Sequence, residues 1–387
     1  MHTPVYLDHH ATTPVDPRVL DAMLPFFGPK FGNAASRTHS FGWEAEKAVE
    51  IARRRIAGLA GAAPREIVFT SGATESNNLA IKGVLEACRA KGNHLVTMAT
   101  EHPAVLDPVR HLEKQGCQAT VLPPGPDGLL DHARLRDAIR PDTVLVSVMF
   151  ANNEIGVVQP IREIGAICRE RGVLFHCDAA QAFGKIPLHV DEDHIDLMSL
   201  SAHKLYGPKG IGALYVRRRQ PRVSLTAQMD GGGHEFGFRS GTLNVPAIVG
   251  FGEACALARR EMSEDAVRTA ALRDRLLALL EAALDDVAVN GSRAQRLPGN
   301  LNVSFRGVEA DTLLLSLPGI ALSTGSACSS ASPEPSHVLK ALGAEPWRGR
   351  SAVRFGIGRF NTAGEIDYVA ARVIESVRRL RSLVPGA

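Results

Sequence analysis

The sequence predicts an α/β fold with a mainly parallel, seven-stranded sheet and a smaller α+β domain. Between residues 60 and 216, seven short apolar runs alternate with helical patterns. Strands that alternate with helices are typical of a parallel sheet covered on both faces. After Cys255 the alternation gives way to longer helical patterns. A chain of 387 residues is long enough for two domains, or for one large domain with an appendage.

The larger domain is expected over residues 15–255. Before the sheet, Val49, Ala52, Ile56 and Leu59 recur at spacings of three and four residues, which predicts one face of a helix. The predicted strands are the apolar runs at 66–70, 94–99, 119–122, 143–149, 173–177, 195–200 and 211–216.

The smaller domain is expected to combine residues 1–14 with 256–387. Leucines at 277, 280 and 284 predict a long helix, and apolar runs at 300–305 and 353–357 predict strands. A second helix is expected near 311–317. The closing helix is predicted from a stripe of apolar residues, Ile366, Val369, Val373, Val377 and Leu380.

Composition narrows the class of protein. Apolar residues make up 45% and charged residues 22%, as in ordinary globular domains, and no run approaches the roughly 20 apolar residues of a membrane span. We therefore expect no membrane partner. The N-terminus has no signal pattern, which favours the cytoplasm.

A net charge of +3 with scattered basic residues gives no reason to expect direct nucleic acid binding. Six cysteines without CxxC spacing argue against zinc or disulfides, so no intrinsic metal is expected.

Lys204 is the most informative single residue. The apolar run at 195–200 leads into Ser201, Ala202 and His203, and Lys204 follows directly. A lysine at the end of a buried strand is costly as an idle charge, but it would suit a Schiff base with pyridoxal phosphate. Asp178 ends another apolar run and could pair with a protonated pyridine nitrogen. When each residue is considered on its own, the alternatives are that Lys204 is a solvent-facing loop lysine and that Asp178 caps a helix.

Two further loops follow predicted strands. The run at 66–70 leads into SGATESNN, where Ala73 and Thr74 would open a helix whose free N–H groups suit a cofactor phosphate. Simple helix capping explains the same residues. His102, after the run at 94–99, could lie over a flat ring and move protons, or it could be a surface histidine. Asn153 follows the run at 143–149 in the same way, at the end where sheets bind ligands. The pair His9 and His10 is interpreted as structural or cofactor-adjacent.

Cys328 stands in the segment LSTGSACSSAS, in which nearly every residue is small. Such a segment contributes little to a core, and we expect it to be mobile. A thiol displayed there is more typical of a reactive group than of a buried structural cysteine, although an incidental thiol is the alternative. Arg354 lies inside a short apolar strand and requires a carboxylate, supplied either by an amino-acid substrate or by an internal Asp or Glu.

The chain resembles the NifS/IscS-like (group I) cysteine desulfurases, in the class V aminotransferase branch of fold type I pyridoxal enzymes. The resemblance extends in order over essentially the whole chain. It is carried by motifs that include YLDHHATTPVDPRV, FTSGATESNNLAIKG, TEHPAVLD, CDAAQAFGKIP, SAHKLYGPKGIGALYVRR and STGSACSSASPEPSHVLKALG.

The resemblance implies a role for each matching position in binding pyridoxal 5′-phosphate. Lys204 would hold the cofactor covalently, Asp178 would contact the ring nitrogen and His102 would stack on the ring. Gln181 would bond the ring hydroxyl. The residues implied at the phosphate are Thr74, Ser201, His203 and, from the partner subunit of a homodimer, Thr242. Ala73 and Asn153 are also expected among the cofactor-binding residues.

The substrate implied by the resemblance is L-cysteine, whose carboxylate Asn33, Asn153 and Arg354 would bind. The enzyme would release L-alanine and leave the sulfur on Cys328 as a persulfide, for iron–sulfur cluster assembly or another thiolation pathway. The expected partners are an iron–sulfur scaffold protein or another sulfur acceptor, and Cys328 could ligate a cluster in transfer. The sequence ends at LRSLVPGA, where relatives commonly continue with a scaffold-docking segment, so the docking mode stays open. The alternative functions are a selenocysteine lyase, another class V pyridoxal enzyme, or a catalytically silent assembly scaffold.

Overall fold

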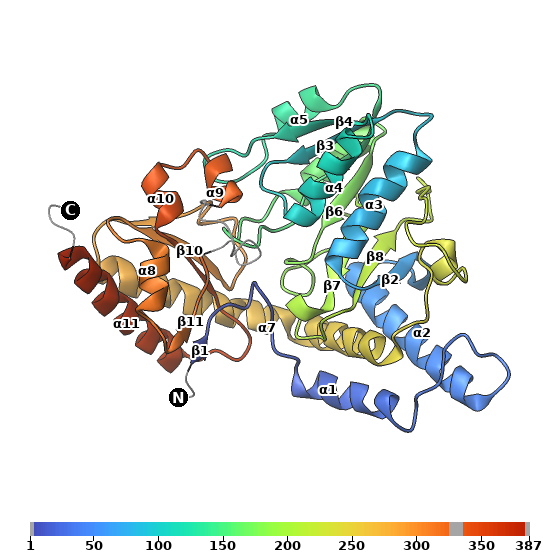
Figure 1. Cartoon of the computed structure of the whole chain (residues 1–387), viewed down its shortest axis with the longest axis horizontal. Coiled ribbons are helices and arrows are strands. Elements are labelled where there is room, and N and C mark those ends of the chain that lie inside the picture. The colour runs from blue at the N-terminus through green and yellow to red at the C-terminus, as the bar shows by residue number, and fades with distance from the viewer. Residues whose placement is uncertain (1–3, 325–335, 384–387) are drawn as a thin grey trace.

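The structure is a computed structural model that describes residues 4–324 and 336–383. It has two sheet-centred parts joined by one long helix (Figure 1). Lys204 and the other predicted cofactor residues belong to the part with the larger sheet.

The larger sheet has seven strands in the order β2-β8-β7-β6-β5-β3-β4. Only β8 runs antiparallel to its neighbours, so the predicted mainly parallel, seven-stranded sheet is confirmed. Each strand lies on one of the apolar runs singled out in the sequence. The bounds are β2 Ile67–Thr70, β3 His94–Met98, β4 Gln118–Leu122, β5 Thr143–Ser147, β6 Leu174–Asp178, β7 Leu197–Ser201 and β8 Gly212–Val216.

Helices cover both faces of this sheet because its strands are apolar on both faces. In β2, Ile67 and Phe69 belong to the core under one layer of helices, and Val68 belongs to the core under the other layer. This division follows from the two-residue period of a strand. One face carries α3 (Ala73–Ala87) and α4 (Pro103–Glu113). The other face carries α2 (Ser40–Ala60), α6 (Ile161–Glu170) and the first half of α7 (Val245–Ala283).

Helix α2 is the helix predicted from the spacing of Val49, Ala52 and Ile56, all of which are buried. It begins after His39, whose side chain accepts a hydrogen bond from Gly42 N, and it ends at Gly61. Gly61 has a φ of 70°, the left-handed conformation that favours glycine after a helix.

The smaller part contains a three-stranded antiparallel sheet, β12-β10-β9, and the short parallel pair β1-β11. Its core joins Val5 and Leu7 from the N-terminus to the apolar stripe of α11. Strands β10 and β12 and helix α11 occupy the positions expected from the sequence, whereas β9 and β11 were not predicted. The bounds are β1 Val5–Tyr6, β9 Val287–Val289, β10 Asn300–Phe305, β11 Ile320–Ala321, β12 Ala352–Gly356, α8 Ala310–Leu315, α9 His337–Ala341, α10 Pro346–Arg350 and α11 Ala363–Ser382.

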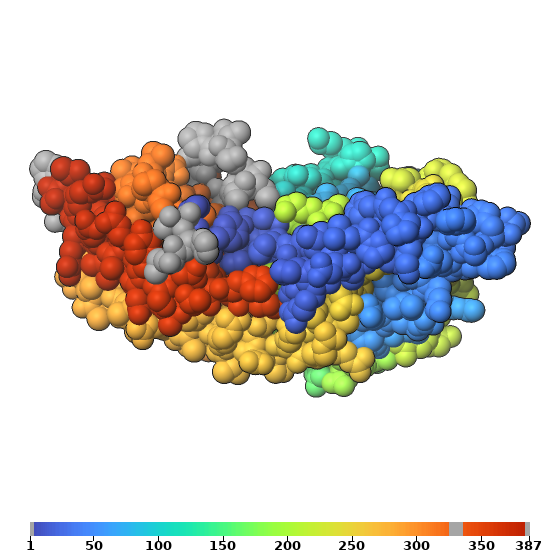
Figure 2. All heavy atoms as spheres, turned by 90° about the horizontal axis from the view of Figure 1, so that it is seen from below, coloured from blue at the N-terminus to red at the C-terminus, as the bar shows by residue number. Residues whose placement is uncertain are grey.

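Helix α7 runs through the predicted domain boundary. It is 39 residues long, and Figure 2 shows it in gold along the lower edge of the molecule, beneath both parts. Its first half, up to Ala258, packs in the core of the large sheet, and Leu272, Leu276 and Leu280 pack in the core of the smaller part. A division at residues 255 and 256 therefore cuts a continuous helix and stays a prediction.

The remaining elements are α1 Pro17–Met23, α5 His132–Ala138 and the short 3₁₀ helices η1 Leu24–Phe27, η2 Pro64–Glu66, η3 Ala202–Lys204 and η4 Glu235–Gly237.

Candidate active site

A cavity of about 580 Å³ opens at the carboxyl ends of the strands in the large sheet. Parallel sheets bind ligands at this edge, where successive strand–helix loops meet. The volume suits a cofactor together with a small substrate. The predicted site residues that line it are Ala73, Thr74, His102, Asn153, Asp178, Gln181, Ser201, His203, Lys204 and Arg354.

Lys204 reaches this cavity from η3, directly after β7. Its Nζ donates hydrogen bonds of 2.7 Å to His10 O and 2.6 Å to Ala11 O. The carbonyl groups of the N-terminal segment therefore hold the amine in place. Next to it, His203 Nδ1 lies 3.1 Å from Thr12 Oγ1, and burial followed by the nearby Lys204 charge lowers the pKa of His203 to about 4. His203 is thus held as a neutral imidazole.

Asp178 is the last residue of β6 and is buried at the floor of the cavity. Its Oδ2 accepts a 2.7 Å hydrogen bond from Asn77 Nδ2, and its Oδ1 accepts one of 3.0 Å from Ala180 N. Two donors that both point at the carboxylate hold it in place. A carboxylate held in this way suits a protonated ring nitrogen.

The N-terminus of α3 forms one wall of the cavity. Gly72 has a φ of 155°, in a region that L-residues rarely adopt, and this conformation turns the chain sharply from β2 into the helix. The first N–H groups of a helix have no intrahelical partner. Those of Ala73 and Thr74 face an anion-binding position at the positive end of the helix dipole.

His102 caps the N-terminus of α4, and its Nδ1 accepts a 3.1 Å hydrogen bond from Ala104 N. Burial lowers its pKa, Asp178 opposes this effect and Lys204 adds to it. The preceding residue, the buried Glu101, accepts a 2.7 Å bond from Met149 N, and burial raises the pKa of that carboxyl well above its ordinary value. An imidazole that lines the cavity is suited to exchanging protons with a ligand there.

The sequence left two partners open for Arg354, an internal carboxylate and the carboxylate of a substrate, and its contacts are consistent with both. Its Nη2 lies 2.6 Å from Asp8 Oδ1, and its Nη1 donates to Asn153 O at 2.9 Å. Asp8 is thus the internal carboxylate that the sequence left open. The Nε atom of Arg354 is buried and has no hydrogen-bond partner among residues 4–324 and 336–383, so a donor remains for a ligand.

Two predicted residues, Asn33 and Thr242, do not line the cavity. Asn33 is exposed and its Oδ1 accepts a bond from Ala35 N, and Thr242 is exposed in the loop before α7. Neither lines the cavity of its own chain. Cys328 lies outside the described residues. Burial raises the pKa of the thiols of Cys168, Cys177 and Cys255, which makes them poor nucleophiles.

Among the cavity residues that sequence reasoning missed are Asn77 and His337. Asn77 sits one helical turn after Thr74, and no local pattern shows that it reaches Asp178, 101 residues away. His337 follows the segment of Cys328 and donates from Nε2 to Glu101 O at 2.9 Å, so its Nδ1 carries the lone pair when the ring is neutral.

The cavity residues fit pyridoxal 5′-phosphate. Three of them carry a buried polar atom that has no protein partner within the described ranges: His10 Nε2, Asn77 Oδ1 and Arg354 Nε. Buried polar groups are normally satisfied, so these atoms indicate a polar ligand. A helix N-terminus for a phosphate, a carboxylate for a ring nitrogen and an amine for an aldehyde lie around one space.

The described residues contain no group of three or more His, Cys, Asp or Glu side chains that could hold a metal ion, and none of their helices is long and apolar enough to cross a membrane.

Comparison with known proteins supports the same chemistry. Residues 5–369 match the family model described as aminotransferase class-V. The chain is 60% identical to "Cysteine desulfurase IscS" of Anaeromyxobacter sp. (strain Fw109-5), over 100% of this chain and 95% of that protein. A solved structure described as a NifS-like protein has a TM-score of 0.90 and 37% identity, and covers 97% of this chain and 99% of its own. Another, described as SspA in complex with cysteine, has a TM-score of 0.80 and 38% identity, over 92% of this chain and 100% of its own.

Proposed function

The chain belongs to the aminotransferase class-V family and, within it, to the cysteine desulfurases, and we propose how its residues carry out that reaction. It is a pyridoxal-phosphate-dependent enzyme that converts L-cysteine to L-alanine and passes the sulfur to a thiol of its own. The observation that best supports this function is one cavity lined by Lys204, Asp178, His102 and Arg354 together.

The cofactor-binding residues act at three points. The N–H groups of Ala73 and Thr74, with Ser201 and His203, hold the phosphate. Asp178 keeps the ring nitrogen protonated, Gln181 bonds the ring hydroxyl, and Lys204 supplies the amine for the aldehyde. When bound, pyridoxal phosphate supplies an electron sink for the carbon atoms of the substrate.

The substrate is bound through its carboxylate. Arg354 offers its Nε, and the Asn153 side chain lies at the same wall of the cavity. Lys204 and His102 take and return the protons at the substrate carbons, because an amine and an imidazole that line the cavity can exchange protons with a ligand there. Asn33 lies outside the cavity, so its contact with the carboxylate stays a prediction.

Cys328 receives the sulfur. Its thiol gives up a proton to a base of the site, and the thiolate attacks the sulfur of the bound cysteine. The Cβ–S bond of the substrate breaks as the new S–S bond forms. The carbon takes a proton, so alanine leaves and Cys328 carries the persulfide. This step is balanced without an external oxidant or reductant.

A homodimer is part of the proposal. Thr242 is exposed and away from the cavity of its own chain, as expected of a residue that contributes to the partner's phosphate site. Large apolar side chains are also exposed between residues 24 and 43, and the rings of Phe31 and Phe41 lie 5.3 Å apart. Exposed apolar groups in such a short stretch are typical of an interface. The exposed residues are Leu24, Phe27, Phe31, Phe41 and Trp43.

We place the enzyme in the cytoplasm, where it would supply sulfur to an iron–sulfur scaffold or another acceptor. The test of the reaction uses the purified holoenzyme with L-cysteine and a thiol reductant. Alanine and sulfide are expected in equal amounts. Alanine from L-selenocysteine but none from L-cysteine would indicate a selenocysteine lyase, and amino transfer to a keto acid without sulfide would indicate an aminotransferase.

A further inference from the structure

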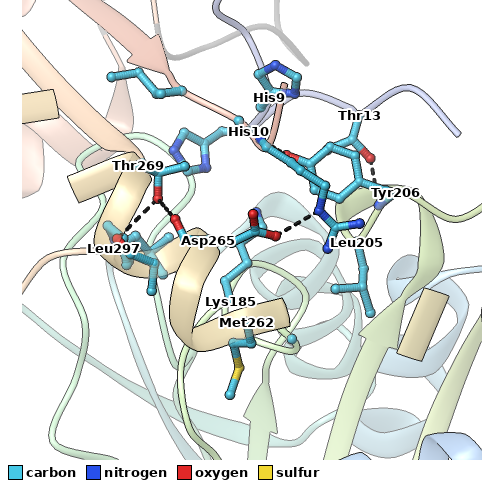
Figure 3. A pocket seen from close by; sticks show the side chains of 17 residues that line it. His9, His10, Thr13, Lys185, Leu205, Tyr206, Met262, Asp265, Thr269 and Leu297 are labelled. Atoms are coloured by element: carbon cyan, nitrogen blue, oxygen red, sulfur yellow. Dashed lines mark hydrogen bonds and ion pairs between the residues drawn. The ribbon is translucent and has the colours of Figure 1, made fainter. Parts of the chain in front are cut away.

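Lys185 lies directly behind the cofactor-binding cavity and has no part in the reaction described above. It follows β6 and is half-buried, and its Nζ donates a 3.2 Å hydrogen bond to Gln181 Oε1. It lines a second, smaller cavity of about 50 Å³. Figure 3 shows Lys185 there, with His9 and His10 from the N-terminal segment and with Met262 and Asp265 from α7.

The charges around Lys185 are mostly of its own sign. Burial, then Lys204 and then Arg354 lower its pKa to about 7. Among the described residues no carboxylate makes a salt bridge with it: Asp265 pairs with Arg359 at 2.7 Å and with Arg268 at 2.9 Å, and Asp8 pairs with Arg354. His9 and His10 also face it, and burial keeps both neutral near pH 7. A charged amine in such a place lowers the stability of the fold.

The hydrogen bond from Lys185 is one of three that fix the orientation of the Gln181 amide. Oε1 accepts from Lys185 Nζ and from His10 Nδ1 at 3.1 Å, and Nε2 donates to His10 O at 2.9 Å. Turning the amide over would set its NH₂ against the Lys185 amine and its oxygen against the His10 carbonyl. The observed orientation leaves one N–H of Nε2 without a partner among the described residues, on a side chain that lines the larger cavity.

We propose that Lys185 is a positioning residue that holds Gln181 with its N–H toward the ring oxygen of bound pyridoxal phosphate. The inference rests on the proposed function, in which Gln181 bonds that oxygen. The ring oxygen is an acceptor in its ionised form, so it requires a donor and is repelled by an amide oxygen. Without Lys185 only the two hydrogen bonds to His10 hold the amide, so its N–H is oriented less firmly and the ionised form of the ring oxygen is bound more weakly.

The test compares Lys185→Met, Gln181→Leu and the double variant in the full chain. Lys185→Met is expected to weaken pyridoxal phosphate binding about tenfold, as for one lost hydrogen bond, and to shift the pH at which the visible band of the holoenzyme titrates. The double variant is expected to bind no more weakly than Gln181→Leu alone, because Lys185 acts through Gln181. Lys91→Met, on the surface, is the matched control.

Lys185→Gln separates the hydrogen bond from a merely structural effect. Its amide NH₂ can still donate to Gln181, so this variant should recover most of the affinity. The proposal is overturned if Lys185→Met keeps wild-type affinity and band titration, if the two losses add in the double variant, or if Lys185→Gln is as weak as Lys185→Met. Failure of the wild-type chain to bind pyridoxal phosphate would overturn the proposed function itself, which distinguishes the two results.

Discussion

The amide of Asn77 on α3 donates a 2.7 Å hydrogen bond to Oδ2 of Asp178 at the end of β6. Both side chains are buried. This single contact joins the helix whose N-terminus suits a phosphate to the carboxylate that suits a ring nitrogen. The separation between the two binding points is therefore fixed before the cofactor arrives, which lowers the entropic cost of binding.

Replacing Asn77 with Ala is expected to weaken pyridoxal phosphate binding by at least tenfold. The variant removes a hydrogen bond to a charged group, worth about 1.5–3 kcal/mol, and leaves a space beside Asp178. The dissociation constant is measured by titrating the cofactor into the cofactor-free chain. Asn78→Ala is the control, because Asn78 is the next residue of α3 and bonds only to Thr74 O. Equal affinity in both variants would show that Asn77 does not support the site.

Arg354→Lys is expected to reduce kcat/KM for L-cysteine about 30- to 100-fold, mainly through KM. Lysine replaces a planar donor group with a point charge and removes the buried Nε, at a cost of about 2–3 kcal/mol. Asp8→Asn is the comparison, since it removes the 2.6 Å ion pair and keeps the guanidinium. If Arg354 serves only that ion pair, both variants would lower stability alike and leave KM unchanged.

Lys204→Ala is expected to abolish alanine formation from L-cysteine. The variant removes the amine that His10 O and Ala11 O hold at the cavity, but keeps Asp178 and the N-terminus of α3. The variant should therefore still bind the cofactor, without the visible band of the wild-type enzyme. Alanine formation and the absorbance spectrum are measured on the same sample. Turnover at the wild-type rate would remove Lys204 from the mechanism.

His176 is expected to make the folded chain sensitive to acid. It lies between Ser147 Oγ at 2.8 Å and Ser199 Oγ at 2.9 Å, and burial lowers its pKa to about 4. Since the ordinary value is about 6.5, the unfolded chain binds a proton between pH 6.5 and 4 that the folded chain does not. Stability should fall as the pH drops through this window, by up to about 1.4 kcal/mol per pH unit from this residue.

Urea unfolding of His176→Gln at pH 5 and pH 7 measures that contribution. The difference in unfolding free energy between the two pH values should be smaller than in the wild type. The other buried histidines titrate in both proteins, so the comparison isolates His176. His111→Gln, on the exposed side of α4, should keep the wild-type difference. An identical difference in His176→Gln would mean that His176 does not titrate in this window.

The sequence predicted the strands and the loops of the site because each is indicated by a short, continuous stretch of residues. Seven apolar runs gave seven strands. Asp178 is the last residue of a strand, and Thr74, His102 and Lys204 lie within four residues of a strand end, at the edge of the sheet that lines the cavity. Contacts between distant segments could not be predicted. The Asp8–Arg354 pair spans 346 residues, and no periodicity relates the two. The domain boundary expected after Cys255 falls inside helix α7, because the two halves of this one helix pack in different cores.

Cys328→Ser is expected to separate cofactor chemistry from sulfur transfer. Lys204, Asp178 and Arg354 remain in the variant, so L-cysteine should bind and change the spectrum of the cofactor. A serine hydroxyl is a far weaker nucleophile toward sulfur than a thiolate, so neither persulfide nor more than a trace of alanine should form. Cys88→Ser, a half-buried cysteine at the end of α3, is the matched control and should keep full activity. Persulfide is measured by alkylation and mass spectrometry, and alanine in the supernatant. Alanine and sulfide released by Cys328→Ser at the wild-type rate would show that sulfur leaves without transfer to this thiol, as in a lyase that eliminates it directly.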